Sequence, residues 1–310
     1  MSATRRLPNF LVAGAARSGT TGLVEGIREH PLAFVTDPKE PHYFALHGLT
    51  PDFAGPGDAH TINRVAVTDR EAYLGLYPQG GDLTALGDGS VSTLYYYERA
   101  IPEIVRLNPD MRIVVLLREP VARAYSSHQY MRARGFEPCE SFLQAVEEEE
   151  TRRSLNWHHL WHYTAMSKYA DGVEALQSAF PRENIGIWFY DDLDRDYAAT
   201  LAHVLRFLQL PVVEGEGLGV PRVNISGTPR SERLHQALSW ATRNEAVRSA
   251  VKRVTSYRMR ERVRRSVLRR DALPAEVRAQ LGPVFDEDLG RLRELIDGDV
   301  PDWLANVGTR

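Results

Sequence analysis

The sequence predicts an α/β fold with a central parallel β-sheet, helices on both faces of the sheet and a helical C-terminal portion. Short continuous apolar runs alternate with segments of helical periodicity through residues 10–208, as in parallel sheets whose crossovers are helices. The run at 112–118, Arg-Ile-Val-Val-Leu-Leu-Arg, is apolar at every interior position, which is typical of a strand buried on both faces. Such a strand belongs in the middle of the sheet.

The other elements follow from the same two patterns. Pro38 and Pro41 disfavour a helix over 36–44, so a structured loop is expected there, and the Gly- and Pro-rich stretch 46–63 is expected to be a surface loop. Strands are expected at 10–13, 32–35, 83–86, 112–118 and 185–190. Helices are expected from 20 onward, at 69–77, 101–107, 121–134, 141–153, 157–180 and 197–208, from 231 onward and at 273–297, with Trp303 packing the tail onto the domain.

The composition is that of a soluble globular protein. Of 310 residues, 43% are hydrophobic and 25% are charged, and we expect a single domain over 1–310. Cys139 is the one cysteine, which excludes a disulfide framework and a multi-cysteine metal site. The sequence shows neither the apolar core of a signal peptide nor a run long enough to span a membrane, so a cytoplasmic location is expected.

Positive charge is concentrated in one segment. The net charge is −3, yet residues 243–270 carry ten Arg and one Lys against Glu245 and Glu261, about nine net positive charges. We expect this segment to be a basic helical flap within the domain, which covers an anionic acceptor or touches a membrane surface. A nucleic-acid-binding role is the alternative, although the segment has no aromatic residue beyond Tyr257 to stack on bases.

The first strand leads through a small-residue loop into a helix, which is the layout of a phosphate-binding site. Gly14 and Gly19 have the spacing of the P-loop motif, but Thr20 stands where that motif has Lys, and Arg17 supplies the cation instead. A phosphate is therefore expected to bind without the lysine of an ATPase, with a P-loop kinase as the rival interpretation. The expected binding residues are Gly14, Arg17, Ser18, Gly19, Thr20 and Thr21.

A second anion site is expected where the strand at 112–118 ends. It ends in Arg118, and the following helix carries Ser126, whereas a metal-dependent nucleotidase commonly has Asp at the strand end. Arg and Ser suit a phosphate rather than a metal. Alone, Arg118 would also be explained by pairing with Glu119 or by capping a helix. Together with the first loop it indicates a ligand with two phosphate positions and no metal between them.

The loop after the second strand adds a carboxylate to this region. It contains Lys39, Glu40 and His42, and Glu40 near an anionic ligand is expected to act as a general base on a hydroxyl or amine. His42 would orient the acceptor or share the proton transfer. Lys39 and Tyr95 are further candidates for contact with the substrate. The alternatives are an ordinary surface Lys-Glu pair and a structural histidine.

These motifs, in this order and at this separation, resemble the sulfotransferases that use 3′-phosphoadenylyl sulfate (PAPS), above all bacterial members akin to the heparan-sulfate and Golgi-type enzymes. The resemblance covers nearly the whole chain, from Phe10 to Trp303. It implies that the first loop binds the 5′-phosphosulfate and that Arg118 and Ser126 bind the 3′-phosphate. It also implies that Glu40 is the catalytic base and that no metal takes part. A small molecule or a glycan is expected as the acceptor, with sugar, lipid, glycopeptide and small-metabolite acceptors all open.

Further expectations come from details of this resemblance. Arg17 would stabilise charge that builds on the leaving 5′-phosphate. Gly89 stands where heparan-type relatives often carry a Lys, so a second cation for the leaving phosphate either comes from elsewhere, with Lys39 as the candidate, or is missing. Arg230 is a candidate for another contact with the 3′-phosphate. Loops supply acceptor pockets in the family, and the candidates here are 46–63, 95–97, 157–161 and 210–270. The resemblance leaves open the identity of the acceptor, the choice between O- and N-sulfation, and the oligomeric state.

Overall fold

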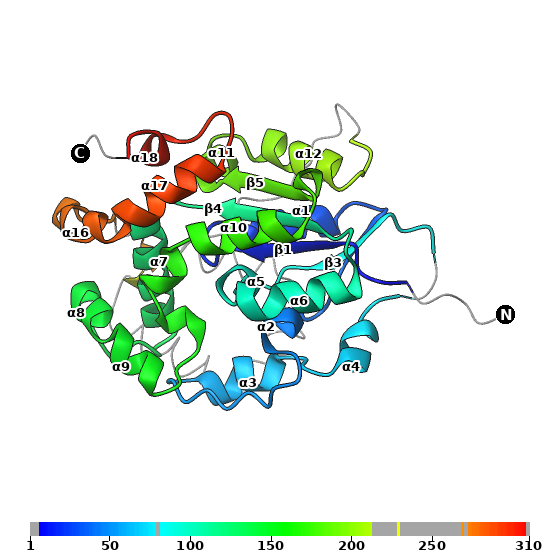
Figure 1. The fold of residues 1–310 in the computed structure, drawn as a ribbon. Helices are drawn as coiled ribbons and strands as arrows, with labels where there is room; N and C mark the ends of the chain where they lie inside the picture. Colours follow the sequence, from blue (N-terminus) through cyan, green and yellow to red (C-terminus); the bar gives the residue numbers. More distant parts are fainter. Residues whose placement is uncertain (1–5, 79–80, 213–227, 230–267, 270–271, 308–310) are drawn as a thin grey trace.

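The computed structural model describes residues 6–78, 81–212, 228–229, 268–269 and 272–307, and it confirms the predicted fold class. Its main sheet has five parallel strands in the order β2-β3-β1-β4-β5 (Figure 1). The strands are β1 (Phe10–Gly14), β2 (Ala33–Val35), β3 (Ala85–Asp88), β4 (Arg112–Leu117) and β5 (Ile185–Phe189). Each expected strand forms, and no end differs from the expected one by more than about two residues.

Helices cover both faces of this sheet, and Figure 1 shows α6 and α10 lying across one of them. The α-helices are α1 (Thr20–Arg28), α2 (Tyr43–Leu46), α3 (Ile62–Val65), α4 (Arg70–Leu74), α5 (Ser92–Tyr95), α6 (Tyr97–Leu107), α7 (Pro120–Ala133), α8 (Phe142–Glu147), α9 (Glu149–Ser154), α10 (Ala170–Ala179), α11 (Tyr190–Arg195), α12 (Tyr197–Phe207), α16 (Ala275–Leu281), α17 (Asp286–Leu295) and α18 (Asp302–Ala305). The 3-10 turns are η1 (Asp58–His60), η2 (His159–Trp161), η3 (Ala165–Ser167), η4 (Arg182–Asn184) and η5 (Gly282–Phe285). A short antiparallel pair is formed by β6 (Thr228–Pro229) and β7 (Leu268–Arg269).

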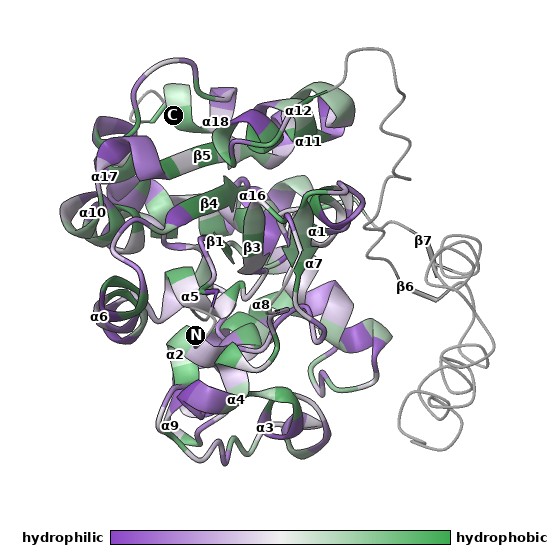
Figure 2. Cartoon of the chain, turned by 90° about the vertical axis from the view of Figure 1, so that its right-hand side faces the viewer, coloured by the Kyte–Doolittle hydropathy of each residue, from purple (hydrophilic) through white to green (hydrophobic). Residues whose placement is uncertain are grey.

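The pleat of the central strands divides the apolar core into two layers. In β4, Ile113, Val115 and Leu117 pack on one face with α6, α7, α10 and α17. Val114 and Leu116 pack on the other face with α1 and α12. All five side chains are buried, which is why the run shows no polar alternation. In Figure 2 the strands are mainly green, whereas the surrounding helices carry purple as well as green.

The expected single helix over 157–180 is wrong, because only α10 forms there, preceded by the turns η2 and η3. Carboxylates from other elements bind the amides that a continuous helix would use itself. Glu149 accepts hydrogen bonds from the backbone N–H groups of Thr164 and Ala165, at 2.6 and 2.9 Å. Asp288 caps the start of α10 in the same way. Because these carboxylates satisfy its backbone amides, the segment before α10 does not need helical hydrogen bonds, and its aromatic side chains pack into the core.

Two other expected helices are interrupted. The stretch 141–153 forms α8 and α9, and 273–297 forms α16 and α17, separated by η5. Pro283 lies in η5, where its missing N–H prevents one continuous helix. Trp303 is buried, as expected, and its indole N–H donates to Asp191 at 3.1 Å.

The sheet topology brings the loops of interest to one edge. All five strands are parallel, so the loops that follow β1, β2, β3 and β4 leave from the same side of the sheet. β1 lies between β3 and β4, and the chain changes direction across the sheet there. Ligands of open α/β sheets bind at such a reversal, beyond the carboxyl ends of the strands.

Candidate active site

The loop after β1 requires glycine at both of its ends. Gly19 is the N-cap of α1 with φ of +92°, and a Cβ at this position would lie 2.6 Å from Leu193 Cδ2. A Cβ on Gly14 would lie 2.8 Å from Leu94 Cβ. The positive φ therefore requires glycine at position 19, and close packing leaves no room for a side chain at position 14 or 19. The spacing that the sequence analysis identified is thus a geometric requirement of this loop.

Hydrogen-bond donors of the loop converge at the N-terminus of α1. The first α-helical hydrogen bond runs from the Leu23 N–H to the Gly19 carbonyl at 3.2 Å, so the amides of Thr20 and Thr21 precede it and have no acceptor within the helix. Ser18 is fully buried, and its hydroxyl has no hydrogen-bond partner among the described residues. A buried unpaired hydroxyl beside helix N-terminal amides fits a phosphate group.

The two arginines predicted from separate motifs come together above β1 and β4. The Arg118 guanidinium donates to the Arg17 carbonyl at 3.0 Å. Arg17 stacks over the Tyr130 ring and Arg118 over the Tyr190 ring, with 4.4 Å from guanidinium carbon to ring centre in both cases. Arg17 also has φ of +68°, which is uncommon for a residue other than glycine and is frequent at functional sites. Both cations are thus held in place by their surroundings.

The residues that follow Arg118 begin the next helix. Glu119 caps α7 by accepting hydrogen bonds from the N–H groups of Val121 and Ala122, at 3.2 and 2.7 Å. The carboxylate is therefore engaged by the helix, which weakens the alternative that it serves mainly as the partner of Arg118. Ser126 lies buried on α7. The end of β4 thus carries Arg118 and the next helix, α7, carries Ser126, as the sequence predicted.

Glu40 and Lys39 form an ion pair on the loop after β2, with Lys39 Nζ 2.7 Å from Glu40 Oε1. The Glu40 side chain is 29% exposed. Burial acts to raise the pKa of Glu40, but the charges of Lys39, His42 and Arg17 outweigh it and leave the pKa below its ordinary value. Glu40 is therefore ionised at neutral pH. The influence of Arg17 also shows that the carboxylate and the phosphate loop share one neighbourhood.

His42 is fixed by polar contacts and by an unusual backbone conformation. Its φ is +56°, its backbone N–H donates to Ser90 Oγ at 3.0 Å, and its Nδ1 lies 2.8 Å from Ser92 Oγ. Burial lowers the pKa of His42 to about 4, against the opposing effect of Glu40. The imidazole is thus neutral at pH 7 and can donate or accept a hydrogen bond.

A cluster of histidine and tyrosine rings extends from His42. It lies largely in the stretches 95–97 and 157–161, which were expected to contribute to the acceptor pocket, although no role was predicted for the individual histidines. The His159 ring centre lies 5.8 Å from that of His42 and 5.5 Å from that of Tyr96. Tyr95, which was expected to contact the substrate, has its hydroxyl 2.8 Å from His162 Nδ1. Burial lowers the pKa of His159 and of His162, the latter to about 4. Three histidines within five positions of the sequence were the available signal.

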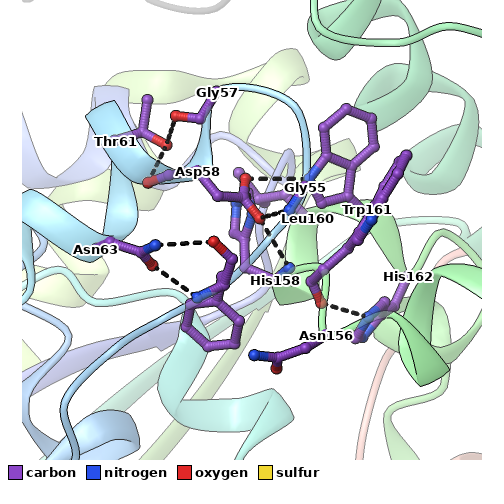
Figure 3. Close-up of polar contacts among 12 residues, drawn as sticks. Gly55, Gly57, Asp58, Thr61, Asn63, Asn156, His158, Leu160, Trp161 and His162 are labelled. Atoms are coloured by element: carbon purple, nitrogen blue, oxygen red, sulfur yellow. Dashed lines mark hydrogen bonds and ion pairs between the residues drawn. The ribbon is translucent and has the colours of Figure 1, made fainter.

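Asp58 joins the loop that carries this cluster to the stretch 46–63, as Figure 3 shows. Contrary to the expectation of a surface loop, Asp58 is 1% exposed. Its carboxylate accepts hydrogen bonds from the Gly55 and His158 backbone N–H groups and from the Trp161 indole, at 2.9, 3.2 and 3.2 Å. Burial acts to raise the pKa of Asp58, but the hydrogen bonds from His158 and Trp161 and the His158 charge leave it below its ordinary value.

Replacing Asp58 with Asn should lower the free energy of unfolding by about 1–3 kcal/mol at pH 7, because a buried set of donors loses its charged acceptor. The folded-state pKa of Asp58 is lowered, so its contribution is present above the unfolded pKa and is lost as the pH falls through the folded value. The difference between wild type and D58N should therefore shrink in acid. Urea unfolding at pH 7 and at acid pH measures this difference in stability, and replacement of the exposed Asp82 with Asn is the control. Equal stability of D58N and wild type at pH 7 would contradict this role.

Comparison with known proteins agrees with the class that fold and site define, an α/β protein of the P-loop type. The family model for the sulfotransferase domain matches residues 7–218, and the chain belongs to this family. Carbohydrate sulfotransferase 15 of Rattus norvegicus and of Homo sapiens are each 24% identical to this chain over 172 residues, which cover 46% of this chain and 30% of the relative. The match thus spans less than a third of the length of these relatives.

A solved structure shares the fold along almost the whole chain. The sulfotransferase from Alicyclobacillus acidocaldarius matches with a TM-score of 0.72 and 24% identity, covering 96% of this chain and 99% of that one. Arg230 and the basic segment 243–270, apart from Leu268–Arg269, lie outside the described residues. Within the described part of the chain, no helix is long and apolar enough to cross a membrane, and no group of three or more His, Cys, Asp or Glu is arranged to hold a metal ion.

Proposed function

We propose that this protein transfers a sulfuryl group from PAPS to an acceptor hydroxyl or amine, with Glu40 as the general base. One observation carries the proposal. The lysine-free phosphate loop, with its buried unpaired Ser18 hydroxyl, lies beside Arg118 and shares its electrostatic neighbourhood with the Glu40 carboxylate. Membership of the sulfotransferase family supports the same reaction.

Bound PAPS would supply an activated sulfuryl group whose leaving group is a phosphate. The loop amides, Ser18, Thr20 and Thr21 would hold the 5′-phosphosulfate at the N-terminus of α1. Arg118 and Ser126 would hold the 3′-phosphate. Glu40 takes the proton of the acceptor, and His42 as a neutral imidazole orients the acceptor group. Arg17 stabilises the negative charge that accumulates on the leaving phosphate.

The acceptor that we propose is a carbohydrate hydroxyl, with an amine as the alternative. The two relatives described above support it, since both are named carbohydrate sulfotransferases. Neutral hydrogen-bonding rings next to the base also favour a polar, uncharged acceptor group. His159 lies within ring contact of both His42 and Tyr96, and burial keeps both imidazoles neutral. Sugar hydroxyls hydrogen-bond to such groups without requiring a countercharge.

Thermal unfolding with nucleotides tests the cofactor. PAP, the product nucleotide, should raise the Tm in the absence of Mg²⁺, because a ligand that binds only the folded state stabilises it. ATP with Mg²⁺ is the competing ligand. If ATP with Mg²⁺ raised the Tm and PAP did not, the kinase interpretation would be favoured and the proposal contradicted. Radiolabelled PAPS incubated with a set of glycans, amines and small alcohols then tests the acceptor.

A further inference from the structure

The backbone carbonyl of Arg118 accepts a hydrogen bond from a buried tyrosine. The hydroxyl of Tyr169, a residue that is 1% exposed, donates to this carbonyl at 2.9 Å. Tyr169 is the N-cap of α10, and its own backbone N–H donates to the Asp288 carboxylate of α17 at 2.8 Å. The other Asp288 oxygen accepts from the Ala170 N–H at 3.1 Å. A helix of the C-terminal portion therefore fixes the residue that holds the Arg118 backbone.

The turn before Tyr169 is fixed from a second side, by α7. Arg123 on this helix is fully buried and donates to Ser167 Oγ at 2.5 Å and to the Tyr163 carbonyl at 2.6 Å. The Ser167 hydroxyl also donates to the Tyr163 carbonyl, at 3.0 Å. Because α7 is the helix that begins directly after Arg118 and Glu119, Tyr169 is held relative to the same helix whose start carries Arg118. A buried network of this kind keeps its members in one arrangement.

A second contact from the C-terminal portion reaches the ring on which Arg118 stacks. That ring belongs to Tyr190, the first residue of α11. The next residue, Asp191, accepts the hydrogen bond from the Trp303 indole N–H of α18 at 3.1 Å. Trp303 is buried and packs edge-on against Phe189, with 5.8 Å between the ring centres. The start of α11, and with it the ring under the guanidinium, is thereby joined to α18.

A third contact comes from Arg278 on α16, whose Nη1 lies 3.2 Å from Oε2 of Glu119, the residue after Arg118. The Arg278 side chain is 43% exposed, so this ion pair contributes less than the two buried contacts do. Figure 1 shows α16, α17 and α18 together at one end of the molecule, next to α7, α10 and α11. Each of the three C-terminal helices thus contacts a different neighbour of Arg118.

We propose, on the basis of the proposed function, that the C-terminal helices α16, α17 and α18 position Arg118 for the 3′-phosphate, with Tyr169 and Asp288 as the main positioning residues. Neither residue touches the nucleotide. A guanidinium forms paired hydrogen bonds to phosphate oxygens only in a fixed geometry, so the support behind it determines the strength of the contact. A change that loosens the Arg118 backbone should therefore weaken the hold on the 3′-phosphate more than the hold on the 5′-phosphate.

Paired affinities for PAP and for adenosine 5′-monophosphate (AMP) test the proposal, because AMP is PAP without the 3′-phosphate. The wild type should prefer PAP, and Tyr169→Phe, which removes only the hydroxyl, should lower this preference by about 3- to 10-fold. Asp288→Asn should also lower it, since an amide has one acceptor oxygen where the carboxylate has two. The exposed Asp286→Asn on α17 and the partly buried Tyr97→Phe on α6 are matched controls, and both should keep the wild-type preference.

The ratio of the PAP and AMP affinities separates positioning from general damage to the fold. If Y169F and D288N weakened both ligands by the same factor, or neither ligand, the proposal would be overturned. Where either variant fails to fold, Trp303→Phe removes the indole N–H but keeps a buried ring, and an unchanged ratio in folded W303F would overturn the proposal as well. A wild type that binds PAP no more tightly than AMP would instead contradict the proposed function, so the two failures are distinguishable.

Discussion

Glu40→Gln should lower kcat by about 10²- to 10⁴-fold, which is the contribution typical of a general base. Gln preserves the size and the hydrogen-bonding shape of the side chain but cannot take a proton from the acceptor. The fold should be unaffected, because the Glu40 side chain is only partly buried and forms an ion pair with its neighbour Lys39. The loss is measured as the single-turnover rate at which the sulfated acceptor forms from PAPS.

The affinity of E40Q for PAP and PAPS shows whether a lower kcat comes from loss of the base or from damage to the nucleotide site. E40Q should bind PAP as tightly as the wild type and PAPS at least as tightly, because a negative charge next to the sulfonate is removed. Exposed Glu98→Gln on α6 is the matched control and should leave both kcat and affinity unchanged. Full turnover by E40Q would remove Glu40 from the role of base. A parallel loss of PAP affinity and kcat would make Glu40 a binding residue instead.

The position of Glu40 could be anticipated from the sequence because local rules determine it. A loop with two prolines after a strand cannot be a helix, and parallel strands bring their carboxyl ends to one edge. The same rules placed Arg17 and Arg118 at that edge. The contacts between these residues depend on tertiary packing that no local pattern encodes. The hydrogen bond from Arg118 to the Arg17 carbonyl links positions 101 apart in the chain.

The segment before α10 shows where local reasoning fails. Its composition suits a helix, but Glu149 from α9 and Asp58 from η1 bind its backbone amides. Once those carboxylates are in place, a turn that inserts His159 and Trp161 into the core is stable. Helix propensity differs by less than about 1 kcal/mol between most residues, which is less than a buried charged hydrogen bond contributes. Tertiary contacts therefore override propensity here, and they build the ring cluster next to Glu40.

Arg17→Ala should lower kcat by about 10²- to 10³-fold, the loss seen when one donor to a developing negative charge is removed. Ala and Arg pay a similar penalty for φ of +68°, so the substitution removes the guanidinium without changing the backbone requirement of the loop. Because we propose that Arg17 acts on the charge that develops on the leaving phosphate, kcat should fall more than PAP affinity. Rapid-quench kinetics together with PAP titration measure the two effects separately.

Arg17→Lys distinguishes charge from geometry at this position. Lys keeps the charge but cannot reproduce the planar stacking of the guanidinium over the Tyr130 ring, so R17K should recover only part of the rate. Tyr130→Leu removes the ring face and should produce a loss of similar size to that of R17K, with Arg17 still present. If the R17A enzyme turned over at the wild-type rate, the loop amides alone would support the leaving phosphate. If R17K matched the wild type while Y130L lost activity, Tyr130 would act by some route other than holding Arg17. Under the proposed function, the Arg17 guanidinium held over the Tyr130 ring would take the place of the lysine that Thr20 cannot supply.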